Sequence, residues 1–174
     1  AVRFVDGKVA STFSTLVDPR CDLTHRVAVL TGIRQKELDA APPIEKIARR
    51  LVAFVGDDPL VGQSIELDVG QLETCGIRLR NRLYDTYELA TLLMPGLPAY
   101  DLAQIAMALG IARQQEHRAL DDALVAGQVF LALFHRASRM DSQRLGHINS
   151  LAAHLPNWPL SDLFAQAQRL QLQR

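Results

Sequence analysis

His117 and Asp122 are the two residues whose types and spacing most directly suggest chemistry. They stand five residues apart, where a long helical pattern begins. Residues five apart do not stack on one helical face, but a histidine just before the first turn and an aspartate within it can point at one place. Such a histidine can accept a proton while the carboxylate holds a metal ion. The same residues also fit plain capping, in which Asp121 and Asp122 complement the helix dipole and His117 caps the helix.

Asp68 is the second candidate. A short apolar run at residues 60–62 ends in Gln63 and Ser64, and a helical segment with Asp68 in its first turn follows. Carboxylates near the carboxyl ends of strands are well placed to reach a ligand in the crevice there. Taken alone, Asp68 equally fits an acid that satisfies the helix dipole.

The composition limits what kind of protein these residues can serve. The 174 residues suit one core, and 48% hydrophobic with 22% charged residues is typical of a globular chain. Nineteen Lys and Arg balance nineteen Asp and Glu, so the chain lacks the basic excess of proteins that coat DNA. Two cysteines are too few for a disulfide framework, and no segment reads as a signal peptide or membrane span. We therefore expect a cytoplasmic protein.

Hydrophobic periodicity predicts the elements that must position the candidates. Asp6-Gly7 between two apolar runs in residues 1–17 predicts a β-hairpin, whereas residues 18–43 indicate turns and prolines. Further along, strands are expected at 58–62 and 83–86, and helices at 44–55, 66–75, 87–94, 101–109 and 117–135. This alternation predicts an α/β fold whose sheet is mixed, because a hairpin is antiparallel.

The C-terminal residues 137–174 differ from the rest. They are polar and helical, and Pro156-Asn157-Trp158-Pro159 separates two short amphipathic helices. We expect two parts, with residues 1–136 as the main domain and residues 137–174 as a helical appendage or linker to a further domain.

The segments around Asp68 and His117, in this order, resemble the second and third motifs of the DnaQ-like (DEDDh) 3′–5′ exonucleases. Other stretches match that family in order and spacing: FVDGKVASTFSTLVDP, LTGIRQKELDAAPP, YDTYELA and LPAYDL followed by LGI. The resemblance covers most of residues 1–135. It implies a ribonuclease-H-like mixed sheet flanked by helices.

The resemblance also implies an activity. Family members hydrolyse the phosphodiester at a 3′ end with two divalent cations, Mg²⁺ or Mn²⁺, held by four carboxylates. Carried over to this sequence, Asp68 and Asp122 would be metal ligands and His117 the general base. Gln63, Ser64 and Arg118 would be candidate substrate contacts. Asp85 would either support the site from behind or cap the helix at Thr86. The expected substrate is a single-stranded 3′ end, with DNA favoured over RNA.

The sequence departs from the family pattern in two places. The family's first motif, Asp-x-Glu, should lie before the hairpin, and this sequence starts beyond that point. Asp6 does not replace it because it occupies a turn and no Glu stands two places on. We therefore expect an N-terminally truncated domain that lacks its first strand and two carboxylates. In the second motif, Gln63-Ser64 replaces His-Asn and Leu67 replaces an aromatic residue, which removes a stacking surface.

Three alternatives stay open for partners and class. Residues 155–170 are similar to the segment that joins an exonuclease domain to a helicase in DinG-type fusions. A proofreading-type nuclease whose tail docks on a polymerase competes with this hypothesis. A non-catalytic nucleic-acid or protein docking module of the same fold is the third, and the altered Gln63-Ser64 pair favours it. The basic cluster Arg78, Arg80 and Arg82 fits either a nucleic-acid contact or a solvated loop.

Overall fold

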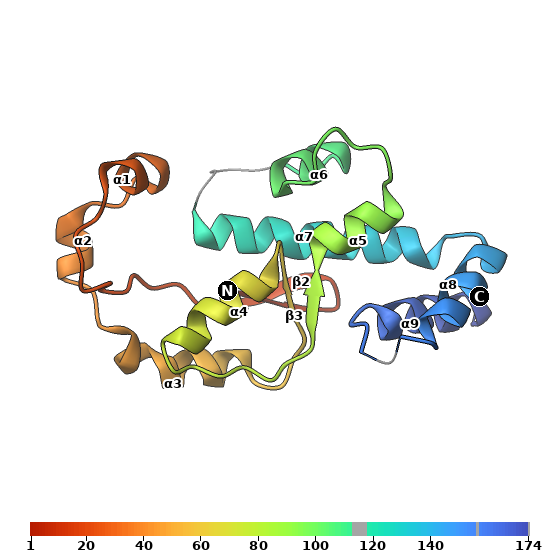
Figure 1. Ribbon diagram of the computed structural model, residues 1–174, viewed down its shortest axis with the longest axis horizontal. Helices are drawn as coiled ribbons and strands as arrows, with labels where there is room; N and C mark the ends of the chain where they lie inside the picture. Colours follow the sequence, from red (N-terminus) through yellow and green to blue (C-terminus); the bar gives the residue numbers. More distant parts are fainter. Residues whose placement is uncertain (113–117, 156, 174) are drawn as a thin grey trace.

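Helix α7 (Ala119–Ser138) is the central element of the structure, a computed structural model that describes residues 1–112, 118–155 and 157–173. It runs across the molecule, with α5 and α6 along one side and α8 and α9 near its C-terminal end, where α9 packs against it (Figure 1). The helices that surround it are α3 (Ile44–Val55), α4 (Ile65–Thr74), α5 (Thr86–Leu93), α6 (Leu102–Ala108), α8 (Ser142–Ala152) and α9 (Ser161–Leu172). All five helices predicted between residues 44 and 135 are present.

The predicted hairpin is confirmed as β1 (Val2–Val5) paired antiparallel with β2 (Lys8–Thr12). Its two turn residues both have positive φ, 51° at Asp6 and 75° at Gly7. A two-residue turn of this kind matches the right-handed twist of the strands, and Asp-Gly is one of the pairs that tolerate it. Asp6 is exposed in this turn, as its position in the sequence suggested.

The second pair of strands is parallel. β3 (Leu60–Gly62) pairs with β4 (Leu83–Asp85) so that Gly62 lies opposite Asp85. A mixed arrangement was expected, and the described strands contain both an antiparallel and a parallel pair. They form two separate two-stranded sheets, however, and not the single mixed sheet that the resemblance implies. β1 and β3 each pack against α7, so side-chain packing on one helix connects the two pairs.

Gly127 explains how closely β1 approaches α7. A Cβ atom on Gly127 would lie 2.6 Å from Cζ of Phe4 in β1, much closer than side-chain atoms ordinarily approach. The ring of Phe4 therefore lies directly on the helix backbone, which only a glycine at this position permits.

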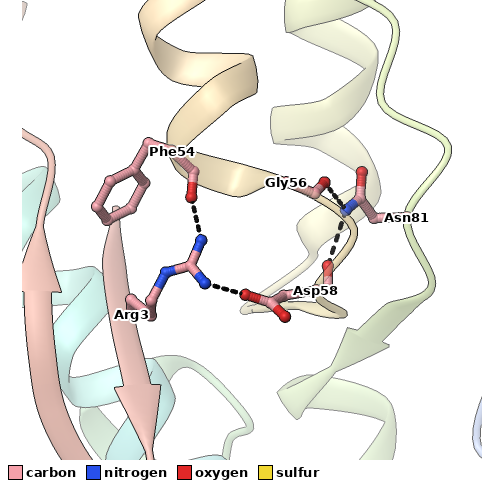
Figure 2. A network of polar contacts seen from close by, with 5 residues as sticks. All are labelled: Arg3, Phe54, Gly56, Asp58 and Asn81. Carbon is pink, nitrogen blue, oxygen red and sulfur yellow. Dashed lines mark hydrogen bonds and ion pairs between the residues drawn. The ribbon is translucent and has the colours of Figure 1, made fainter.

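On its other side, the hairpin is held by Arg3. Its guanidinium donates to the carbonyl of Phe54 at the end of α3 and to the carboxylate of Asp58, with which it forms an ion pair (Figure 2). Asn81 Nδ2 then donates to the carbonyls of Gly56 and Asp58, each at 2.8 Å. This network joins the hairpin, the turn before β3 and the segment before β4, so it fixes the start of both parallel strands.

Two short helices occupy the region where only turns were predicted. They are α1 (His25–Thr31) and α2 (Gln35–Asp39), and they lie at the opposite end of the molecule from α8 and α9 (Figure 1). Thr24 caps α1, accepting a hydrogen bond from Val27 N at 3.4 Å, and Gly32 ends it in the left-handed conformation. β-Branched residues have low helix propensity, which is why the sequence did not indicate α1.

The C-terminal helices share the main hydrophobic core. The core joins five helices, α5 to α9, and its fully buried members include Leu89, Ile105, Val129, Leu133, Leu145 and Phe164. Two short helices separated by residues 156–159 were predicted here, and they are present as α8 and α9. The division of the chain at residue 136 stays a prediction. Within the described part of the chain, no helix is long and apolar enough to cross a membrane.

Polar contacts also fix these helices. The indole Nε1 of Trp158 donates to Glu88 in α5 at 2.7 Å, and Arg82 forms an ion pair with Asp162 at the start of α9. Gln171 donates to the carbonyl of Met140 at 2.6 Å. Because Arg82 pairs with an acid of α9, this member of the basic cluster has a structural role.

Candidate active site

The carboxyl ends of β3 and β4 form the base of the candidate site. Gly62 ends β3, and α4 begins three residues later at Ile65. A Cβ atom on Gly62 would lie 2.7 Å from Cδ1 of Ile65 and 3.2 Å from its Cβ. The first residue of α4 thus folds back tightly against the end of the strand, and a glycine is needed to leave it room.

Ser64 makes the turn between β3 and α4. It has the left-handed conformation, with φ 54° and ψ 44°, which costs free energy in a residue other than glycine. Its backbone N–H donates to Oδ1 of Asp85 at 3.1 Å, and the same oxygen accepts from Tyr87 N at 2.8 Å. Asp85 therefore caps α5, as the sequence suggested, and also holds the turn between β3 and α4, while its support of a catalytic site stays a prediction.

Asp68 lies in the first turn of α4. At about 100° per residue it falls near Ile65, which is buried, whereas Glu66 falls on the exposed side. Although Asp68 is exposed as a whole residue, partial desolvation of its carboxyl raises the pKa of that group above its ordinary value of 3.8. Leu67, which replaces an aromatic residue of the family, is 75% exposed.

Asp122 continues the buried stripe of α7. Residues 126, 129 and 133 follow it at spacings of four, seven and eleven, and all three are buried, Val129 and Leu133 completely. Residues at these spacings share one helical face, so Asp122 occupies the first position of the face that packs on the protein. Asp121, about 100° away, is half-buried as Asp122 is, and it lines a surface hollow of about 480 Å³ with Leu124 and the buried Val125.

Arg118, the residue just before α7, extends toward α1 and α2. Its Nη2 lies 3.5 Å from the position that a Cβ atom on Gly32 would take. Hydrogen bonds from Arg34 lower the pKa of Glu37, and the nearby Arg118 charge adds to this effect. Arg118 thus connects the α1–α2 segment to the start of α7. His117, the predicted base, lies outside the described residues.

The side chain of Gln63 lies within a polar network. Its Nε2 donates to the backbone carbonyl of Tyr100 at 2.6 Å, and its Oε1 accepts from the hydroxyl of Thr86 at the same distance. Thr86 is fully buried. Sequence reasoning missed Thr86, since a threonine between a strand and a helix carries no signal beyond its place at the junction.

The donor chemistry of Asp68 and Asp122 fits a hard divalent cation. Mg²⁺ is commonly bound through one or two carboxylates, with waters and substrate phosphates completing its coordination. Among the residues that the structure describes, no three His, Cys, Asp or Glu side chains gather into a group that could hold a metal by themselves. Any cation held here would therefore depend on these two carboxylates together with other donors.

Comparison with known families identifies the fold and the class. The family model described as Exonuclease (RNase T) matches residues 1–130 of the chain. The chain belongs to this exonuclease family. The DnaQ-like resemblance of the motifs is thereby confirmed, and the protein is an exonuclease domain of that group.

Relatives of this exonuclease domain include replication and repair proteins. It is 35% identical over 138 residues to DNA polymerase III subunit epsilon of Aquifex aeolicus, covering 76% of this chain and 68% of that protein. It is 34% identical over 140 residues to a PolC-type DNA polymerase III of Clostridium perfringens, covering 78% of this chain and 10% of that protein. It is 27% identical over 168 residues to the 3′–5′ exonuclease DinG of Bacillus subtilis, covering 94% of this chain and 18% of that protein. The chain therefore spans only a small part of the last two relatives.

A solved structure agrees with the fold. Exonuclease X in complex with 5′ overhanging duplex DNA matches with a TM-score of 0.66 and 19% identity, covering 80% of this chain and 82% of that chain. The α/β fold of the ribonuclease-H-like class is thus confirmed, in a form that is mostly helical with small sheets.

Proposed function

We propose that this exonuclease domain removes nucleotides from single-stranded 3′ ends, with DNA as the favoured substrate, in a reaction that depends on Mg²⁺ or Mn²⁺. The observation that carries the proposal is the position of Asp122 on the inward face of α7. Asp121, its neighbour in sequence, is half-buried as well and lines a surface hollow with Val125. Asp122 is half-buried there, and its carboxylate is an oxygen ligand of the kind that Mg²⁺ and Mn²⁺ prefer.

The roles of the other residues follow from their places. Asp68 and Asp122 would hold the metal, which when bound polarises the phosphate and activates water. Desolvation raises the pKa of Asp68, which makes its charged form costly until a cation compensates it. His117 would accept the proton of the attacking water. Ser64 and Arg118 would bind and orient the terminal phosphate, since hydroxyl groups and guanidinium groups both bind phosphate oxygens.

The setting in the cell is proposed from the relatives. Polymerase III subunits and DinG combine an exonuclease with replication or repair, so a polymerase or a covalently following helicase is the proposed partner of α8 and α9. The proposed location is the cytoplasm.

Release of nucleotides from a 3′-labelled single-stranded oligonucleotide in Mg²⁺ or Mn²⁺ tests the function. We expect Asp122→Asn to lower the rate by about a hundredfold or more, because a lost metal ligand removes several kcal/mol of transition-state stabilisation. The matched variant Asp121→Asn should keep the rate, and EDTA should abolish it. Release that survives Asp122→Asn would contradict the proposal.

A non-catalytic docking module is the second candidate. The observation that favours it is that no three His, Cys, Asp or Glu side chains of the described residues gather into a group that could hold a metal ion. A wild-type chain that binds a fluorescent oligonucleotide in either metal but never shortens it would support the module and contradict the nuclease.

A further inference from the structure

Thr86 joins the two strand–helix junctions of the candidate site from inside the protein. Its hydroxyl, completely buried, lies 2.6 Å from Oε1 of Gln63 and 3.1 Å from the carbonyl of Gly62. A hydroxyl has one proton to donate, so the shorter contact to the Gln63 amide is the stronger bond. A residue of the β4–α5 junction thereby holds the end of β3.

The Gln63 amide is used at both of its ends. While Oε1 accepts from Thr86, Nε2 donates to the carbonyl of Tyr100 at 2.6 Å. The hydroxyl of Tyr100 in turn donates to the carbonyl of Met94 at 2.9 Å, after α5. The side chain of Gln63 is therefore directed into the protein and connects β3 to the segment before α6.

The turn that follows Gln63 needs this support. Ser64 has a left-handed conformation that is costly for its residue type, and such conformations persist where neighbouring contacts enforce them. Two consecutive residues supply those contacts, with Asp85 accepting from Ser64 N and Thr86 holding Gln63. Helix α4 begins at the next residue, and Asp68 lies in its first turn.

We propose that Thr86 and Gln63 are positioning residues that set the direction of α4 and thereby the place of the Asp68 carboxylate. This inference rests on the proposed function, in which Asp68 holds the metal ion. Gln63 then acts through Asp68 and does not touch the substrate.

The expected effects follow from the network. In Thr86→Val the new side chain has the same shape as threonine but leaves Oε1 of Gln63 without its donor, which favours a shift of residues 62–64. Loss of a group that orients a metal ligand typically weakens metal affinity or activity by 10–100-fold. We expect Thr86→Val to weaken Mn²⁺ binding about tenfold and to lower kcat by a similar factor, with KM for the oligonucleotide unchanged. Thr86→Ser keeps the hydroxyl and should restore both.

The test is Mn²⁺ binding to the full chain, followed by electron paramagnetic resonance without any oligonucleotide, together with kcat and KM for each variant. Thr91→Val is the matched control, because the Thr91 hydroxyl donates to a carbonyl of its own helix at 2.7 Å. Melting curves by circular dichroism show that each variant is folded. Gln63→Met should behave as Thr86→Val does.

The outcomes separate this inference from the proposed function. If Asp68→Asn leaves Mn²⁺ affinity unchanged, the metal assignment fails and the positioning role fails with it. If Asp68→Asn weakens Mn²⁺ binding while Thr86→Val matches the wild type, the assignment stands and only the positioning role is overturned. If Gln63→Met raises KM alone, Gln63 is a substrate contact and the inference is wrong.

Discussion

Asp68 and Asp122 have the same relation to their helices. Each lies in the first turn, and each shares that turn with a second acid, Glu66 for the first and Asp121 for the second. Acids in a first turn often only complement the helix dipole. Helical periodicity distinguishes a metal ligand from an acid that only complements the dipole, because a dipole effect does not require a particular face of the helix.

Asp68→Asn tests the electrostatic consequence of this placement. Because the pKa of Asp68 is raised in the folded protein, this group adds to the free energy of unfolding at pH values below its ordinary pKa. This contribution is lost as the pH rises through the raised pKa of the folded state. At neutral pH the charged carboxyl therefore destabilises the metal-free protein. We expect Asp68→Asn to melt at a higher temperature than the wild type in EDTA at about pH 7, and the difference to disappear near pH 4.

Glu66→Gln is the matched control for that measurement and should show no such gain. Adding Mg²⁺ should stabilise the wild type and not Asp68→Asn, since a ligand stabilises the state that binds it. A wild-type melting temperature above that of Asp68→Asn throughout the pH range in EDTA would contradict the assignment of the raised pKa.

Gly127 provides a second test at a single residue. Gly127→Ala places a methyl group 2.6 Å from Cζ of Phe4, so the ring or the helix must move. Overpacking of this kind costs about 1–3 kcal/mol in the free energy of unfolding, measured in urea. Gly70→Ala is the control, because a Cβ there meets nothing within 4 Å and alanine favours helices. Equal stability of the two variants would show that Phe4 does not lie on α7.

Among the elements, the hairpin is the one held by the most specific contacts. The Phe13 ring lies 5.6 Å from the Phe54 ring of α3, and the guanidinium of Arg3 lies over the same Phe54 ring. These contacts and the network of Figure 2 connect the hairpin to α3 on one side, while Phe4 connects it to α7 on the other. The position of the hairpin therefore depends on side chains more than on backbone pairing.

Arg3→Met measures what the Arg3 network contributes. The variant keeps an apolar chain over Phe54 but loses the bonds to Phe54 O and Asp58, and we expect a loss of about 1–3 kcal/mol in the free energy of unfolding. Arg20→Met removes a surface ion pair with Glu45 and should cost under about 1 kcal/mol. If both variants lose the same amount in urea, the network is no stronger than a surface ion pair.

Local sequence signals predicted most of the helices and strands but not the contacts between them. Asp6-Gly7 and the apolar spacing of residues 44–55 depend on neighbours in sequence, so the hairpin and α3 were predicted correctly. The β-branched residues of α1 have low helix propensity, so the sequence did not predict this helix, whose stability depends on its caps. The inward direction of the Gln63 side chain was not predictable, because it depends on Thr86 and Tyr100, which are distant in sequence. Motif order indicated Asp68 and Asp122, and their roles stay predictions.

At the scale of the whole molecule, one core connects the candidate site to the C-terminal helices. The stripe of α7 that begins at Asp122 continues through Val129 and Leu133 into the cluster that contains Phe164 of α9. A helix of 20 residues spans about 30 Å, so α7 carries this connection across the molecule.

Phe164→Ala tests the connection. Phe164 is fully buried, and its removal should lower the free energy of unfolding by about 3–5 kcal/mol. If the core is one cooperative unit, circular dichroism and nucleotide release should be lost at the same urea concentration. Leu172→Ala, in the same helix but 83% exposed, is the control and should change little. Two separate transitions in the wild type would show that the C-terminal helices unfold independently.

The contact between Trp158 and Glu88 has a practical consequence. The sequence contains one tryptophan, and its indole ring stacks on Phe164 of α9 while its N–H reaches Glu88 of α5. The intrinsic fluorescence of this protein therefore arises at the point where α9 meets α5. A red shift of the emission would report that the C-terminal helices have detached, without any attached dye. The protein thus contains a natural optical probe for the contact between these helices and the rest of the core.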